Sequence, residues 1–278
     1  MIELSVGKIL ADMFRYGFVQ RAALVGTLVS LCAALLGVSL VLKRYAMIGD
    51  GLSHVGFGIL TIATAFGMTT PLYLAIPGVI IAAIILLKIG NNSQIKGDSA
   101  IALISSTALA IGVAVTSLTT GLNTDVCNFM FGSILTISQT DLYLSIGASI
   151  IVLVLFVIYY RKLFAITFDE DFSKAVGLNV KLYTNLIAIL TAIIIVIGMT
   201  MMGTMLISSI IIFPALTSMR LFKSFKKVII SSAIVSVCSF LVGLYLSFAY
   251  EVSPGAMIVL VNLIVFICFD LVNRIVHE

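Results

Sequence analysis

Residues 182–219 read LYTNLIAILTAIIIVIGMTMMGTMLISSIIIFPALTSM and contain no Asp, Glu, Lys, Arg or His. A helix needs about 20 apolar residues to cross about 30 Å of hydrocarbon, so this run is too long for a single crossing. Its apolar pattern is interrupted between Gly198 and Gly203. The stretch therefore predicts two transmembrane helices joined by a short connection.

The rest of the 278-residue chain has the same character. Hydrophobic residues make up 61% of it and charged residues only 10%, whereas soluble domains carry about a quarter charged residues. This composition excludes both a soluble enzyme and a disordered chain. Short segments of alternating polarity, which barrel strands would need, do not occur. We expect an all-α polytopic transmembrane bundle of about eight to nine helices. The nine candidate spans are 22–42, 45–68, 71–89, 99–122, 141–160, 182–200, 203–220, 228–250 and 254–273.

Lysine and arginine side chains indicate the orientation, because they gather in cytoplasmic loops. If the spans alternate, most of these cations fall on one side, which predicts a cytoplasmic C-terminus. The cations on that side are Lys43, Arg44, Lys88, Lys96, Arg161, Lys162, Lys174, Lys181, Arg220, Lys223, Lys226, Lys227 and Arg274. Three cations do not fit this orientation, because the count places them on the opposite side. They are Lys8, Arg15 and Arg21. Either the first span tolerates them, or a later segment is re-entrant and the count is eight.

The N-terminal residues 1–21 are expected to form an amphipathic interfacial helix, followed by a transmembrane domain over 22–278. Apolar residues share one face of this helix, as in helices that lie on a membrane surface. They are Ile2, Val6, Ile9, Leu10, Met13, Phe14 and Phe18. A longer first span is the alternative. Glu3 and Asp12 argue against a secretory signal peptide.

Ionisable groups inside membrane spans are expensive and are therefore candidates for function. Asp50 and His54 are the acidic and imidazole groups of the second span, and their i, i+4 spacing places them on one helical face. Oxygen and nitrogen ligands suit Zn²⁺, Mn²⁺ or Fe²⁺. A structural pair that neutralises itself is an equal alternative from spacing alone. Nearby glycines indicate either close helix packing or a widened pore. They are Gly49, Gly51, Gly56 and Gly58.

A segment between two spans, 161–181, forms the second informative stretch. Asp169, Glu170 and Asp171 mark a helix start, and Gly177 marks its end. The expected short helix carries an apolar stripe of residues four apart. The stripe consists of Phe168, Phe172 and Val176. Such a stripe favours either a partner surface or packing onto the membrane interface.

No catalytic set is present in the sequence. It contains no HExxH or GxSxG motif, and no GxxxxGK[ST] nucleotide-binding loop, so any use of ATP requires another chain. Asp50 and Asp270 lack the flanking residues that an intramembrane protease would need. The four cysteines include no CxxC pair and indicate neither a disulfide nor a metal site. The net charge of +4 fits the orientation bias and requires no nucleic-acid partner.

Five motifs in order along the chain resemble the membrane-spanning permeases of metal-type ABC importers, which take up zinc, manganese or iron. KRYAMIGDGLSHVGFGIL at 43–60 is similar to that family's signature R-M-x-x-x-G-D-x-x-S-H, with a small departure at Tyr45-Ala46-Met47. The other four are DVCNFMFGSILTISQTDL at 125–142, FDEDFSKAVGL at 168–178, GTMLISSIIIFPALTSMRL at 203–221 and SPGAMIVLVNLIVF at 253–266.

The resemblance implies a role for each part. Asp50 and His54 match residues of the metal pathway, so the ion is transported rather than held as a permanent cofactor. Segment 168–178 matches the helix that couples to the ATPase, with Phe168, Asp169, Glu170, Asp171, Phe172 and Gly177 as its candidate residues. The implied partners are a second copy of the chain, a cytoplasmic pair of ATP-binding subunits and an extracellular solute-binding protein. The implied location is a bacterial plasma membrane.

Two other functions compete with this one. A proton-coupled secondary metal transporter would use Asp50 and His54 as a relay, but such transporters are expected to show inverted repeats with interrupted helices, and none is evident. A membrane scaffold would leave both residues unexplained. Zn²⁺, Mn²⁺ and Fe²⁺ all accept these ligands, so the sequence does not select among them.

Overall fold

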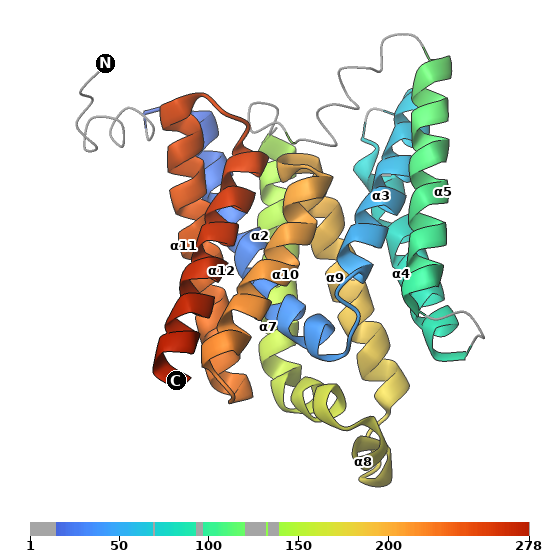
Figure 1. Ribbon diagram of the computed structural model, residues 1–278. Helices are drawn as coiled ribbons and strands as arrows, with labels where there is room; N and C mark the ends of the chain where they lie inside the picture. Colours follow the sequence, from blue (N-terminus) through green and yellow to red (C-terminus); the bar gives the residue numbers. More distant parts are fainter. Residues whose placement is uncertain (1–14, 69, 93–96, 120–131, 133–138, 278) are drawn as a thin grey trace.

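The computed structural model describes residues 15–68, 70–92, 97–119, 132 and 139–277 (Figure 1). Every regular element in these residues is an α-helix, which confirms the predicted fold class. The elements are α2 (Gly17–Leu42), α3 (Ile48–Ala65), α4 (Leu72–Asn92), α5 (Gly97–Leu118), α7 (Gln139–Phe168), α8 (Glu170–Ala175), α9 (Val180–Met202), α10 (Thr204–Leu221), α11 (Phe225–Tyr250) and α12 (Pro254–His277).

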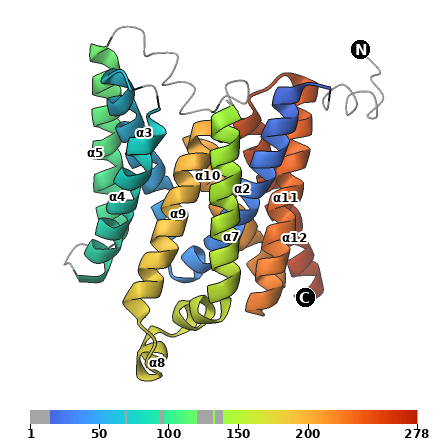
Figure 2. The same ribbon diagram turned by 180° about the vertical axis from the view of Figure 1, so that it is seen from behind.

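All of these helices except α8 are long, and successive long helices run in opposite directions (Figures 1 and 2). In the described residues they correspond one to one with the nine candidate spans. The short helix α8 lies at the lower end of the bundle in Figure 1, together with the α2–α3 connection and the C-terminal end of α12. Helix α2 begins at the opposite end.

Seven of the described helices are long and apolar enough to cross a membrane. Helix α3 is not among them and carries Asp50 and His54, while the apolar part of α4, Leu72–Lys88, is shorter. The outer helices α5, α7 and α12 expose large apolar side chains such as Leu103, Ile158 and Ile264. Such a surface is costly in water and is favourable against lipid chains.

The N-terminal boundary differs from the prediction. Residues 17–21, which were expected to end an interfacial helix over 1–21, instead begin α2. The first span is therefore longer than 22–42, because Gly17 to Arg21 continue the helix without a break. The remainder of the expected interfacial helix lies outside the described residues.

The cations are divided between the two ends of the bundle. Most of the described lysines and arginines lie at the end that holds α8, which we call the basic end. They include Lys43, Arg44, Arg161, Lys162, Lys174, Lys181, Arg220, Lys223, Lys226, Lys227 and Arg274. Arg15 and Arg21 lie at the other end, as the alternating count of spans requires.

Helix α9 forms the centre of the bundle and packs against α2, α3, α4, α7 and α10. Its middle residues, Ile194, Ile195 and Ile197, have no exposed surface. It is joined to α10 by Gly203 alone, whose φ of +85° is a conformation that side-chain-bearing residues rarely adopt. The short connection predicted from the sequence is thus a single glycine.

Glycines allow α3 to approach three neighbouring helices. A Cβ atom on Gly58 would lie 2.7 Å from the carbonyl oxygen of Ala108 in α5, so only glycine fits at this distance. The other three glycines of the group also face neighbours. The facing residues are Ile211 of α10 for Gly49, Ile101 of α5 for Gly51 and Met199 of α9 for Gly56. Close packing, and not a widened pore, is therefore the role of these glycines.

Replacing Gly58 by Ala should force α3 and α5 apart, because a backbone carbonyl cannot rotate away as a side chain can. We expect a loss of about 1–3 kcal/mol in stability, measured as thermal unfolding in detergent by circular dichroism. Gly147→Ala is the matched control, since Gly147 lies in α7 with nothing within 4 Å of a Cβ atom. The control should unfold at the same or a higher temperature. Equal losses in both variants would contradict the packing role.

Candidate functional site

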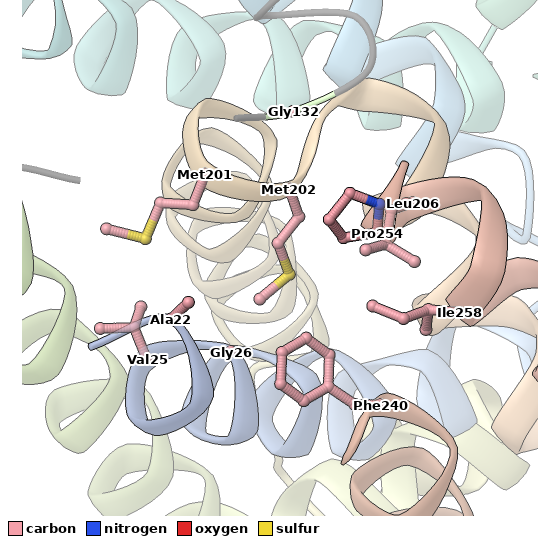
Figure 3. A pocket seen from close by; sticks show the side chains of 11 residues that line it. Ala22, Val25, Gly26, Gly132, Met201, Met202, Leu206, Phe240, Pro254 and Ile258 are labelled. Carbon is pink, nitrogen blue, oxygen red and sulfur yellow. The ribbon is translucent and has the colours of Figure 1, made fainter. Parts of the chain in front are cut away.

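A pocket near the end of the bundle opposite α8 is apolar throughout (Figure 3). Its walls come from α2, α9, α10, α11 and α12, and Met201 and Met202 contribute the sulfur atoms seen in the figure. The ring of Phe240 fills the space beside Gly26, where a Cβ atom would lie within 1.9 Å of the ring. Its lining holds no carboxylate or imidazole. This pocket is a packing feature of the bundle, and the candidate ligands lie elsewhere, on α3.

Asp50 lies in the first turn of α3, closer to the helix end than the predicted span 45–68 implied. Helix α2 ends at Leu42 and α3 begins only at Ile48, so the intervening turn shortens the second helix at this end. A carboxylate in the first turn of a helix is stabilised by the unpaired amide groups there. His54 follows one turn later on the same face.

The two side chains are close but do not satisfy each other. His54 Nε2 is 3.7 Å from Asp50 Oδ1, which is longer than a hydrogen bond. The side chain of Asp50 is 43% exposed and that of His54 is 21% exposed. His54 Nδ1 is buried and has no hydrogen-bond partner among the described residues. The ring nitrogen that faces Asp50 is Nε2, so the two side chains face each other without the hydrogen bond of a self-satisfied pair.

The geometry of the pair also suits a shared metal ion. Zinc binds imidazole nitrogen and carboxylate oxygen at about 2.0–2.2 Å, so two donors on one ion lie at most about 4.2 Å apart. The observed separation of 3.7 Å falls within that limit. No group of three or more His, Cys, Asp or Glu side chains occurs in the described part of the chain. Within the described residues, Asp50 and His54 thus form a candidate pair and not a larger group.

The short helix α8 has well-defined ends. Asp169 is its N-cap and accepts a hydrogen bond from the backbone N–H of Phe172 at 2.8 Å. At its other end Gly177 has a φ of +84°, and the N–H of Leu178 reaches back to the carbonyl of Ser173. This is the Schellman arrangement that glycine favours. Both boundary signals in the sequence thus act at the predicted residues.

The apolar stripe is shared between two elements. Phe172 and Val176 are 64% and 63% exposed on and just after α8. Phe168 is instead the last residue of α7, and its ring packs against Phe164 and Phe225 at centroid distances of 4.9 and 5.6 Å. The expectation that Phe168 belongs to the short helix is therefore wrong, because α7 continues to this residue.

The acidic residues of α8 have separate partners. Asp171 pairs with Lys174 at 3.1 Å within the helix, and both side chains are exposed. Glu170 pairs across the structure with Lys43 at 2.5 Å. Burial, together with the nearby carboxylate of Glu170, raises the pKa of Tyr45 above its usual value. In the sequence, Lys43 was informative only as a positive charge that indicates orientation, since nothing local in the sequence links it to residue 170.

Asp270 forms ion pairs with two arginines. Its two carboxylate oxygens lie 3.4 Å from Arg220 Nε and 3.1 Å from an Arg274 guanidinium nitrogen. Arg220 also lies over the ring of Phe266. These contacts tie α10 to α12 at the basic end. They leave Asp270 with a structural role, in agreement with the absence of catalytic motifs from the sequence.

An alternating bundle of long apolar helices, with ionisable side chains on α3 and a capped amphipathic helix at the basic end, is the architecture of a multi-pass membrane protein. The chain belongs to the ABC 3 transport family, which matches residues 15–273. The resemblance stated from the motifs is thereby confirmed. The chain is a multi-pass permease of an ABC transporter and not an enzyme.

Similar proteins support this assignment. The manganese transport system membrane protein MntC of Halalkalibacterium halodurans is 30% identical over 90% of this chain and 85% of its own length. The high-affinity zinc uptake system membrane protein ZnuB of Haemophilus influenzae is 32% identical over 88% of this chain and 94% of its own. A solved structure titled PsaBC from Streptococcus pneumoniae in complex with Fab matches with a TM-score of 0.85 and 29% identity, covering 95% of both chains.

Removing the N-cap should loosen α8. Asp169→Ala loses the hydrogen bond to the Phe172 amide, which destabilises a helix by about 1 kcal/mol. Amide hydrogen exchange of residues 170–176 should therefore become about fivefold faster. Asp171→Ala is the control, because Asp171 lies in the same helix and makes only an exposed contact with Lys174. The same rate in both variants would show that the cap does not hold this helix.

Proposed function

We propose that this chain is the membrane subunit of an ABC importer that carries a divalent transition-metal ion into the cytoplasm. Mn²⁺ and Zn²⁺ are the favoured cargoes, because relatives are named for manganese and zinc, and Fe²⁺ accepts the same ligands. The observation that carries the proposal is the approach of His54 Nε2 to within 3.7 Å of Asp50 Oδ1 on one face of α3, without a hydrogen bond between them. The ion is the cargo and not a resident cofactor.

An incomplete ligand set suits transport better than a closed one. A dication in a low-dielectric bundle requires anionic or imidazole ligands. A site with four protein ligands would hold zinc as a structural ion, whereas a carrier must release it. We propose that a second copy of the chain supplies the other ligands, so that two carboxylates and two imidazoles surround the ion in a homodimer. Each subunit then withdraws only two contacts at release.

The basic end of the bundle is proposed to face the cytoplasm of a bacterial cell. The excess of lysine and arginine there is the support, since such residues remain on the cytoplasmic side. With this orientation the C-terminus is cytoplasmic, and the exposed Phe172 and Val176 of the α8 region are available to a cytoplasmic pair of ATP-binding subunits. An extracellular solute-binding protein would deliver the ion at the opposite end. No nucleic-acid partner is implied.

Removing either ligand should stop transport. Asp50→Asn removes the charge that offsets a dication, and His54→Ala removes the imidazole. We expect each to lower ATP-driven uptake of radiolabelled Mn²⁺ or Zn²⁺ into proteoliposomes by at least about tenfold. The complex should still assemble, because both side chains are partly exposed. Glu251→Gln and His277→Ala are controls that remove another carboxylate and the other histidine of the sequence.

Three results would contradict this function. Normal uptake by both Asp50→Asn and His54→Ala would exclude a metal pathway at this pair. Uptake that follows a proton gradient and continues without ATP hydrolysis would indicate the proton-coupled transporter. Loss of assembly in each single variant, measured by co-purification of the ATPase, would indicate a structural pair.

Coupling through α8 should depend on its exposed stripe. Phe172→Ala removes an apolar contact, and Gly177→Pro cannot adopt the φ of +84° that ends the helix. Both should weaken co-purification of the ATPase by about tenfold or more, while membrane insertion remains normal. Phe66→Ala is the matched control, because Phe66 is 82% exposed and lies at the other end of α3. If both α8 variants bind the ATPase as well as the wild type does, the proposed docking through α8 is wrong.

A further inference from the structure

Lys43 joins three segments that are distant in the sequence. Its Nζ lies 2.5 Å from Glu170 Oε1 of α8 and donates a hydrogen bond to Thr184 Oγ1 of α9 at 3.2 Å. Lys43 itself caps the C-terminal end of α2. The lysine side chain is only 5% exposed, although Glu170 is 44% exposed. A nearly buried ammonium group requires such partners, because burial without them strongly disfavours the charge.

A rigid turn connects Lys43 to the metal-site helix. The N–H of Tyr45 donates to the carbonyl of Leu40 at 2.8 Å, and Arg44 adopts a φ of +62°. The N–H of Ile48 then donates to the carbonyl of Tyr45 at 3.0 Å, so that α3 starts directly from this turn. Backbone hydrogen bonds of Tyr45 and Ile48 thus hold the turn between Lys43 and α3. A short hydrogen-bonded turn therefore joins Lys43 to the first turn of α3, where Asp50 lies.

The ion pair between Glu170 of α8 and Lys43 joins α8 to an element that is distant in the sequence. Helix α8 packs on α7 and α9, which are its neighbours in sequence. The pair of Lys43 and Glu170 instead spans 127 residues. The other ion pair of α8, Asp171 with Lys174, is formed within the helix and joins no second element. One helix thus offers a buried long-range pair and an exposed local pair for direct comparison.

We propose that Lys43 is a positioning residue that transmits movement of α8 to α3 and hence to Asp50 and His54. The inference rests on the proposed function, in which α8 contacts the ATPase and α3 holds the ion. When the ATPase shifts α8, Glu170 pulls on the lysine, and the rigid turn carries that displacement into the first turn of α3. Thr184 holds the same ammonium against α9. Access to the metal ligands then changes with the nucleotide state of the partner.

The test measures how many metal ions enter for each ATP hydrolysed. The assembled transporter is placed in proteoliposomes with Mn²⁺ as the cargo, and uptake and hydrolysis are recorded together. Lys43→Met preserves side-chain length without charge, and Glu170→Gln preserves shape at a partly exposed position. Both should retain ATPase association and hydrolysis but lower the ratio of ions to ATP by about tenfold. The exchanged variant Lys43→Glu with Glu170→Lys should recover most of that ratio.

Matched controls separate coupling from stability. Lys174→Met removes the same charge as Lys43→Met, but from the exposed pair of the same helix, and should leave the ratio unchanged. Lys43→Arg retains the charge and should behave as the wild type. Thermal unfolding of each complex is measured alongside, since a purely structural pair would lower the unfolding temperature and would reduce hydrolysis and uptake together.

Several outcomes overturn the inference. An unchanged ratio in Lys43→Met and Glu170→Gln does so, as does a parallel loss of hydrolysis and uptake that follows thermal stability. Failure of the charge exchange to recover the ratio also does so. In each of these cases wild-type uptake driven by ATP leaves the proposed function standing. If the wild type itself takes up no Mn²⁺ or Zn²⁺ with ATP, the proposed function and this inference fail together.

Discussion

Hydrocarbon offers no hydrogen-bond partner to a peptide group, and this constraint governs the whole molecule. Every crossing segment must satisfy its own backbone, so the described chain consists of helices and the short turns between them. Charged side chains are moved to the ends of the bundle for the same reason. The ion pairs at the basic end, among them Asp270 with Arg220 and Arg274, stabilise helix ends there. Any ionisable group away from those ends requires a separate explanation.

Helix α3 carries two such ionisable groups, Asp50 in its first turn and His54 one turn later. It packs closely on α5, α9 and α10 through glycines, yet the face with Asp50 and His54 remains partly exposed. Close packing on one side holds the helix in place, while the uncovered face leaves the side chains of Asp50 and His54 accessible. A carrier needs both properties, because its ligands must be positioned before the ion arrives and must remain able to release it. In the proposed function, the separation of 3.7 Å between His54 Nε2 and Asp50 Oδ1 would meet the first requirement without completing a coordination shell.

The sequence predicted the features that depend on neighbouring residues. Long runs poor in charged residues indicated eight or nine helices, and Asp169 and Gly177 marked the ends of α8, because hydropathy and helix capping act over a few residues. The predictions failed where the decisive contact is distant or the boundary is weak. Phe168 continues α7 and packs on Phe225, more than 50 positions away. The pairing of Lys43 with Glu170 could not be inferred, since no local pattern relates residues 127 positions apart. The roles of Asp50 and His54 rest on chemistry that spacing alone left open.

The connection of α9 to α10 through Gly203 has a mechanical consequence. A loop of several residues can lengthen, and the helices it joins can slide past each other along their axes. A single residue has no such reserve, because only the two peptide units on either side of Gly203 link the helices, and each spans about 3.8 Å between Cα atoms. The adjoining ends of α9 and α10 can therefore tilt about Gly203 but cannot separate. In any rearrangement of the bundle these two helix ends must move together. Larger displacements are open only to helices that are joined by longer connections.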